Sequence, residues 1–268
     1  MRLHIICFAL CALLALPGRA HEFWISPQTY TVAPEAQILA DIRVGQTFKG
    51  SAYSFIPQQF KRFDLVQGDR VIPVTGRIGD RPALAMDAPG DGLVTVVHQT
   101  SDFFLTYREA EKFLNFITEK DFAWVLADHE ARGLPDAGFR ERYSRYAKSL
   151  IAVGSGAGAD QEVGLLTEII ALANPFTDDL SDGLPVQVLY QGAARADVQV
   201  EVFARVPDGA VTVMQTRTDS EGYAMIPVEA GSEYLVDAVV MRPLDPVAES
   251  DPVWESLWAS LTFQVPSD

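Results

Sequence analysis

The sequence has 268 residues but little cysteine or histidine, and this limits the chemistry open to it. Both cysteines, Cys7 and Cys11, lie in the apolar N-terminal segment. If that segment is removed, no thiol remains, which excludes disulfide bonds, thiolate zinc sites and a cysteine nucleophile. Any histidine-based site beyond residue 20 must be built from three residues, His21, His98 and His129.

Basic residues are also scarce, because 21 lysines and arginines stand against 36 aspartates and glutamates. The resulting net charge of −15 disfavours nucleic acid as a partner, since phosphate binding needs clustered Lys and Arg. The sequence lacks the HExxH motif, the nucleophile elbow and the phosphate-binding loop of common enzyme classes. Beyond residue 20 no apolar run is long enough to span a membrane, so we expect no membrane-embedded segment there.

Residues 1–20 have the anatomy of a secretory signal. Arg2 supplies the positive start, residues 5–16 form the apolar middle, and small residues precede a cut after Ala20. We therefore expect a periplasmic protein whose mature chain begins at His21.

A histidine in the first position of a chain is a potential metal chelate. The free α-amine and Nδ1 of His21 can bind one ion together. In model peptides an α-amine titrates near pH ~8 and an imidazole near pH ~6.5, so both lose their proton readily at neutral pH. The plain alternative is that the signal happens to be cut before a histidine.

The other two histidines occupy positions from which they could join such a site. His98 ends an apolar strand expected at 93–97, and His129 continues the apolar stripe of an expected helix. We predict that His21, His98 and His129 converge on one divalent transition ion. The alternative for His98 and His129 is a hydrogen-bonded position in the core, which is the commoner role of an inward histidine.

The pattern of apolar residues predicts a mainly β fold with a helical insertion. Residues 21–153 are expected to form an N-terminal antiparallel β-sandwich, interrupted by helices over 107–150. A glycine-rich linker is expected at 154–160. Residues 161–268 are then expected to form a C-terminal immunoglobulin-like or transthyretin-like sandwich.

Three helices are expected in the insertion. A capping box at 106–109 would open the first, and the second would carry His129. The third would begin near Phe139. It would carry a basic run that we expect to be a solvated face: Arg140, Arg142, Arg145 and Lys148.

Several segments, taken in order, resemble a bacterial periplasmic family known as domain of unknown function 4198, which is grouped with components of nickel and cobalt uptake. These segments are His21-Glu22-Phe23-Trp24, Val97-His98-Gln99-Thr100, His129–Pro135, Glu141–Lys148, Ala173-Asn174-Pro175-Phe176 and Val188–Gly192. The resemblance spans nearly the whole mature chain. It implies a periplasmic metal-associated protein that serves a membrane or outer-membrane transporter and has no established enzyme activity. Some nickel-uptake relatives place a histidine third, where this chain has Phe23, so the chelate of His21 also suits copper.

Three classes of function follow from these observations. The first is a soluble periplasmic protein that binds nickel, cobalt or copper and delivers the ion to a transporter. The second is a β-sandwich interaction module without metal. The third is a copper-dependent oxidase that uses an N-terminal histidine brace.

Overall fold

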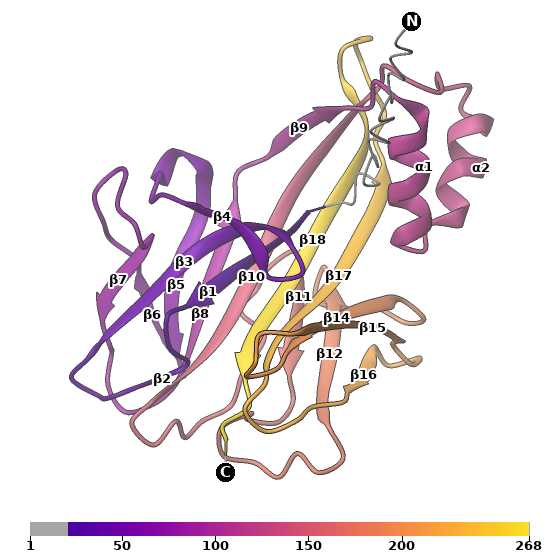
Figure 1. Ribbon diagram of the computed structural model, residues 1–268. Helices are drawn as coiled ribbons and strands as arrows, with labels where there is room; N and C mark the ends of the chain where they lie inside the picture. Colours follow the sequence, from indigo (N-terminus) through magenta and orange to yellow (C-terminus); the bar gives the residue numbers. More distant parts are fainter. Residues whose placement is uncertain (1–20, 268) are drawn as a thin grey trace, which may run out of the picture.

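A computed structural model describes residues 21–267, and the expected signal at 1–20 lies outside them (Figure 1). The fold is mainly β with a helical insertion, as the sequence predicts. Neither helix in the described part of the chain is long and apolar enough to cross a membrane. The elements are β1 (Glu22–Pro27), β2 (Thr31–Val32), β3 (Gln37–Gln46), β4 (Lys49–Tyr53), the 3-10 turn η1 (Pro57–Gln59), β5 (Phe60–Gln67), β6 (Arg70–Pro73), β7 (Leu84–Asp87), β8 (Gly92–Thr100), β9 (Phe103–Thr106), α1 (Ala110–Glu119), α2 (Ala123–Ala131), β10 (Arg140–Val153), β11 (Thr167–Ala171), β12 (Leu184–Tyr190), β13 (Ala193–Ala194), β14 (Gln199–Arg205), β15 (Val211–Arg217), β16 (Tyr223–Ile226), β17 (Glu233–Pro243) and β18 (Pro252–Gln264).

One large sheet of ten strands runs through the molecule. Its order is β15-β14-β17-β18-β10-β8-β5-β6, with β2 and β9 also paired to β10. The long strands β10, β17 and β18 lie at its centre (Figure 1). β10 and β18 are parallel, with Arg142 opposite Glu255. The sheet thus joins strands from both sides of the linker expected at 154–160.

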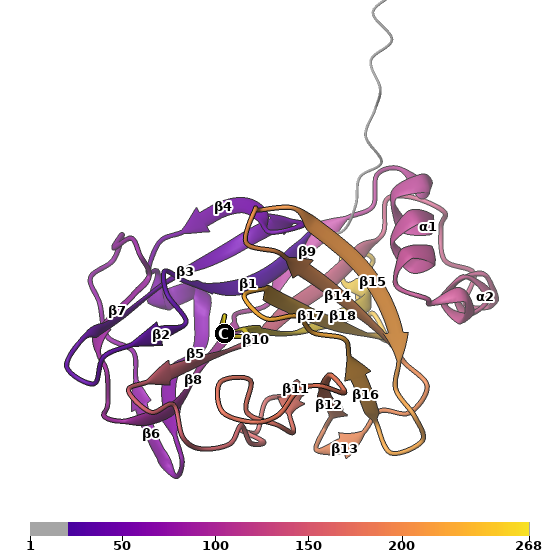
Figure 2. The ribbon, with the colours of Figure 1, turned by 60° about the horizontal axis from the view of Figure 1, so that its bottom comes forward.

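Two smaller sheets cover opposite faces of this large sheet (Figure 2). The sheet of β1, β3, β4 and β7 packs on one face, where Ala147 and Ile151 of β10 belong to its core. The sheet of β11, β12, β13 and β16 packs on the other, where Leu150 of β10 belongs to the core. Because successive side chains of β10 point to opposite faces, this strand contributes residues to the cores on both sides of the large sheet.

The two helices pack on the same face as β1, at the far end of the large sheet. Phe116 of α1 stacks on Trp258 of β18 with ring centroids 5.7 Å apart. Helix α1 begins at Ala110, and its N-cap residue, Glu109, makes no side-chain capping bond, so the capping box at 106–109 was a wrong prediction.

The third expected helix is strand β10, which corrects the prediction over the last part of the insertion. Its apolar residues fit a helical stripe as well as an alternating strand, and periodicity alone does not separate the two. Pairing with β9, β8 and β18 decides the outcome. The helical insertion is therefore limited to α1 and α2.

The glycine-rich segment after β10 is a closely packed loop. The Asn174 side-chain amide donates hydrogen bonds to the carbonyls of Gly156 and Gly158, at 2.8 and 2.9 Å. Gly154 has φ of +57°, and a Cβ there would lie 2.2 Å from the Asp91 carboxylate. Glycine is needed for this close approach, as well as for the left-handed backbone.

Candidate functional site

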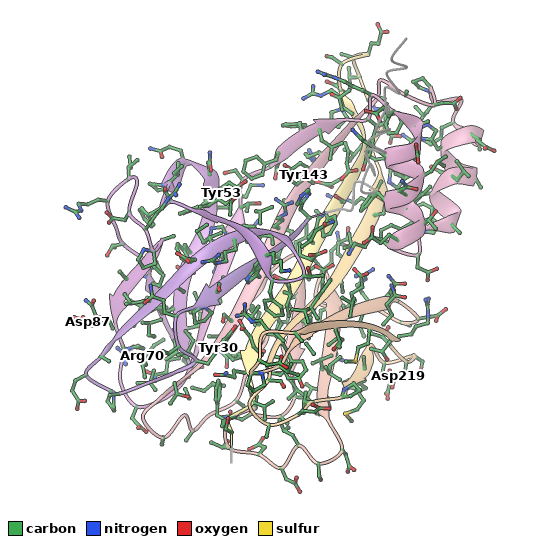
Figure 3. The ribbon with its side chains drawn as sticks, viewed as in Figure 1. Tyr30, Tyr53, Arg70, Asp87, Tyr143 and Asp219 are labelled. Atoms are coloured by element: carbon green, nitrogen blue, oxygen red, sulfur yellow. The ribbon has the colours of Figure 1, made fainter. Side chains whose placement is uncertain are left out.

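A groove crosses the face of the large sheet that carries β1, between the β1 sheet and helix α1. It consists of an inner cavity of about 130 Å³ and an outer cavity of about 400 Å³. Tyr143 and Arg145 of β10 line both cavities, so the two adjoin, and together they are called the groove. Tyr53 of β4, also in the inner cavity, lies on the opposite wall from Tyr143 (Figure 3).

Arg145 is the one positive side chain shared by the two cavities. Its guanidinium lies over the rings of Tyr143 and Phe23, at 4.9 and 5.6 Å from their centroids. It donates a hydrogen bond of 3.3 Å to the backbone carbonyl of His21. Its Nε is buried without a partner, and burial lowers the pKa of the group. Within residues 21–267, Arg145 forms no salt bridge with a carboxylate.

His98 lines the inner cavity and is fully buried. Three phenylalanines surround its ring, Phe23, Phe60 and Phe63, with centroids 5.3, 4.6 and 4.9 Å away. Neither ring nitrogen has a hydrogen-bond partner. Burial lowers the pKa of His98 to about 3, so the imidazole stays neutral and keeps one donor and one acceptor.

His21 lines the outer cavity at its exposed end. Its backbone carbonyl accepts a hydrogen bond from Arg145, and its imidazole forms no hydrogen bond with another described residue. On the wall of the same cavity, the buried carboxyl of Glu141 accepts hydrogen bonds from Tyr107, at 2.6 Å, and from Ser256. Burial raises the pKa of Glu141 to about 7.

His129 lies apart from the groove, in the core between α2 and β18. Its Nδ1 accepts a 3.0 Å hydrogen bond from the indole of Trp254, and its Nε2 donates one of 3.0 Å to the carbonyl of Pro135. Its ring packs against Phe113 and Phe139, with centroids 5.2 and 4.6 Å away. Both nitrogens are thus satisfied, as expected of a core histidine.

The structure therefore does not bring the three predicted ligands together. His21 and His98 lie at the two ends of one groove, and His129 belongs to a separate aromatic cluster. Over residues 21–267, no group of three or more His, Cys, Asp or Glu side chains could hold a metal ion. A single three-histidine centre does not fit this arrangement.

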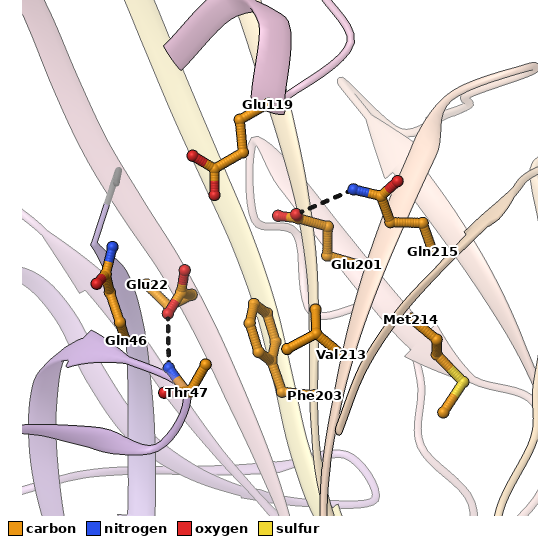
Figure 4. A pocket seen from close by; sticks show the side chains of 9 residues that line it. All are labelled: Glu22, Gln46, Thr47, Glu119, Glu201, Phe203, Val213, Met214 and Gln215. Carbon is orange, nitrogen blue, oxygen red and sulfur yellow. Dashed lines mark hydrogen bonds between the residues drawn. The ribbon is translucent and has the colours of Figure 1, made fainter. Parts of the chain in front are cut away.

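A third cavity, of about 340 Å³, lies where Glu22 of β1 faces Glu201 of β14 (Figure 4). Glu22 accepts a hydrogen bond of 3.2 Å from the backbone of Thr47. The buried ammonium of Lys120 pairs with Glu201 and Asp237. Burial raises the pKa of Glu22 to about 8 and that of Asp237 to about 6. This cavity is rich in carboxyl groups and is unsuited to an anionic ligand.

Comparison with known proteins gives a family. A family model described as "Domain of unknown function (DUF4198)" matches residues 18–242. The chain belongs to this family. No curated protein matches it. A solved structure of a tetra-tandem repeat in the extending region of a large adhesion protein is similar over 92% of this chain, at 10% identity and a TM-score of 0.21. The chain spans half the length of that structure, and the low TM-score carries no argument.

The match to the DUF4198 family covers most of the groove. It begins before His21 and ends at residue 242, so it includes β1, β4, β8, β9 and β10. Trp258 and Ser256 of β18 lie beyond it. The family description assigns no function, and a role in nickel or cobalt uptake therefore stays a prediction.

Sequence reasoning missed Arg145, which it placed on the solvated face of a helix. On strand β10, Arg140, Arg142 and Lys148 share one face of the sheet, and Arg145 lies on the other. On the face away from the groove, Arg142 pairs with Glu255 at 2.7 Å and Lys148 is buried against Asp160 at 2.8 Å. The alternating positions of Glu141, Tyr143 and Arg145 are the signal that could have placed these three on one face.

Proposed function

We propose that the protein is a periplasmic binding protein that takes one divalent transition metal ion in the outer cavity, with His21 as the anchoring ligand. The observation that carries this proposal is the uncommitted imidazole of His21 at the exposed end of the groove. A cut after Ala20 would add the α-amine of the same residue as a second nitrogen donor.

The donor set of His21 determines which ions are suitable. Amine and imidazole nitrogens favour nickel, copper and cobalt, whereas calcium and magnesium require oxygen cages. A two-nitrogen chelate leaves coordination positions for water or a co-ligand. Because Arg145 places a positive charge in the same groove, an anionic co-ligand is favoured there.

An exposed anchoring ligand suits transport better than it suits a permanent structural site. Ions bound at the surface by few protein donors can exchange, as delivery to a membrane transporter requires. Structural metal sites, in contrast, are closed by a complete set of protein ligands. We therefore infer binding and delivery as the role, in preference to catalysis by a histidine brace or an interaction module without metal.

Calorimetric titration of copper, nickel and cobalt into the mature protein tests the proposal, after intact mass has shown that the chain begins at His21. We expect an added alanine before His21, and separately His21→Ala, to weaken binding about tenfold or more, since each removes one nitrogen donor. His129→Gln is the matched control and should leave the affinity of the folded protein unchanged. Equal affinity in all four proteins would overturn the proposal.

A further inference from the structure

We propose that the inner cavity binds a small aromatic carboxylate with a ring hydroxyl, of the hydroxybenzoate class. The carboxylate would pair with Arg145, the ring would lie among the aromatic side chains of the cavity, and the hydroxyl would meet His98. This inference does not rest on metal binding at His21.

The size and walls of the cavity fit a single aromatic ring. Its volume of about 130 Å³ is close to that of an engineered apolar cavity of about 150 Å³ that binds benzene. Its walls include Phe23, Phe60, Phe103 and Tyr143, and aromatic rings stack or meet edge to face with favourable energy. A saturated chain would lack these ring contacts.

The charge in the cavity calls for an anion. Two other basic side chains of β10 have carboxylate partners: Arg142 contacts Glu255 and Lys148 contacts Asp160. Arg145 forms no salt bridge among the described residues and interacts with Glu141 and Asp237 only at longer range, although its Nε is buried. The guanidinium lies over the Tyr143 ring, 4.9 Å from its centroid, and guanidinium groups can bind a carboxylate through two hydrogen bonds.

The two unpaired nitrogens of His98 favour a ligand with a polar group next to this side chain. Burying an unpaired polar group costs about 1–3 kcal/mol, so two unpaired imidazole nitrogens in a phenylalanine box require an explanation. A neutral imidazole can accept a hydrogen bond from a phenol, or donate one to it. A ring hydroxyl would satisfy His98 without placing a charge among the phenylalanines.

Calorimetric titration of the metal-free mature protein with a chelator present tests this assignment. The probes are 4-hydroxybenzoate, 3-hydroxybenzoate, benzoate, benzyl alcohol and acetate. We expect saturable binding of a hydroxybenzoate, weaker binding of benzoate, and binding of benzyl alcohol and acetate about tenfold weaker or more, because each lacks the charge or the ring. Since no metal is present, failure here would leave the proposal for His21 standing.

Variants separate the two contacts. Arg145→Gln should weaken hydroxybenzoate about tenfold or more, and Arg145→Lys should weaken it less because the charge is kept. Arg142→Gln is the matched control, since this residue lies on the same strand, faces the other way, and leaves Glu255 paired with Arg242. His98→Leu should remove the preference for hydroxybenzoate over benzoate.

Three results would overturn the assignment. One is equal affinity for benzyl alcohol and hydroxybenzoate. Another is an unchanged affinity in Arg145→Gln that has the same unfolding midpoint as the wild type. The third is the absence of any binding heat or competition with the probes at millimolar concentration.

Discussion

Two aromatic clusters of this molecule each enclose a histidine, and the two histidines differ in their hydrogen bonds. Around His129, Trp254 and Pro135 satisfy both ring nitrogens. Around His98, three phenylalanines leave both ring nitrogens without a hydrogen-bond partner. Both histidines are buried, so burial alone does not distinguish a histidine of the core from one that faces a ligand site. The hydrogen bonds do.

The same contrast recurs on strand β10 between two basic residues on opposite faces. Lys148 is enclosed with Asp160 at 2.8 Å and Glu168 at 3.6 Å. Arg145 faces the groove and lies over two aromatic rings; it forms no salt bridge among the described residues, although Glu141 and Asp237 interact with it at longer range. Buried polar atoms without a hydrogen-bond partner also occur outside the groove, at Trp24, Ser149 and Arg195, but His98 and Arg145 bring three such atoms to one cavity. This contrast marks the groove as the place where a ligand is needed.

The largest expected loss of stability comes from removing Lys148, the basic residue that has carboxylate partners. Lys148→Met would leave Asp160 and Glu168 buried without their cation, and we expect a loss of about 3–5 kcal/mol in unfolding free energy. Arg145→Met breaks no salt bridge among the described residues and should cost about 1 kcal/mol or less. Urea denaturation at neutral pH measures both. Equal losses in the two variants would contradict the contrast.

Placing the same substitution at both histidines sharpens the comparison. His129→Phe leaves the indole N–H of Trp254 and the carbonyl of Pro135 without partners, so we expect a loss of about 2–3 kcal/mol. His98→Phe removes two unsatisfied nitrogens and has a neighbouring cavity to relax into, so we expect a change within about 1 kcal/mol. Thermal and urea unfolding of the pair test this. A greater loss at His98 would reverse the assignment of roles.

Acid should sharpen the comparison further, with a smaller effect. Burial lowers the pKa of His98 to about 3, whereas an unfolded histidine titrates near ~6.5. Below pH ~6.5 the imidazole of His98 is protonated in the unfolded chain but stays neutral in the native state. The free energy of unfolding of the wild type therefore decreases as the pH falls from ~6.5 towards 3. Relative to pH 7.5, His98→Phe should gain about 2 kcal/mol over the wild type near pH ~5. Parallel pH dependences of unfolding in the two proteins would contradict the described environment of His98.

Much of the fold could be predicted from the sequence because alternation is a local signal. The strand expected at 93–97 lies within β8, and the regions expected to be β on either side of the helices contain the other strands except β10. Strand β10 could not be predicted, since the spacing of Tyr143, Tyr146 and Leu150 also fits a helix and its pairing with β18 is remote in sequence.

The site was predictable only in part, for a similar reason. The inward position of His129 follows from its helical stripe, but its bond to Trp254 joins residues 125 positions apart. The phenylalanine box of His98 assembles β1, β5 and β8. Arg145 was hidden by the helical assignment of β10. Pairwise contacts of this kind carry no local pattern in the sequence.

The most direct test of the metal proposal is an NMR titration of the mature protein with copper or nickel, which follows the side-chain signals of its three histidines. A paramagnetic ion bound at the outer cavity should broaden the His21 signals first, while those of His129, held in the core against Trp254, should persist. Broadening of His129 ahead of His21, or unchanged signals from His21 at saturating metal, would contradict the account.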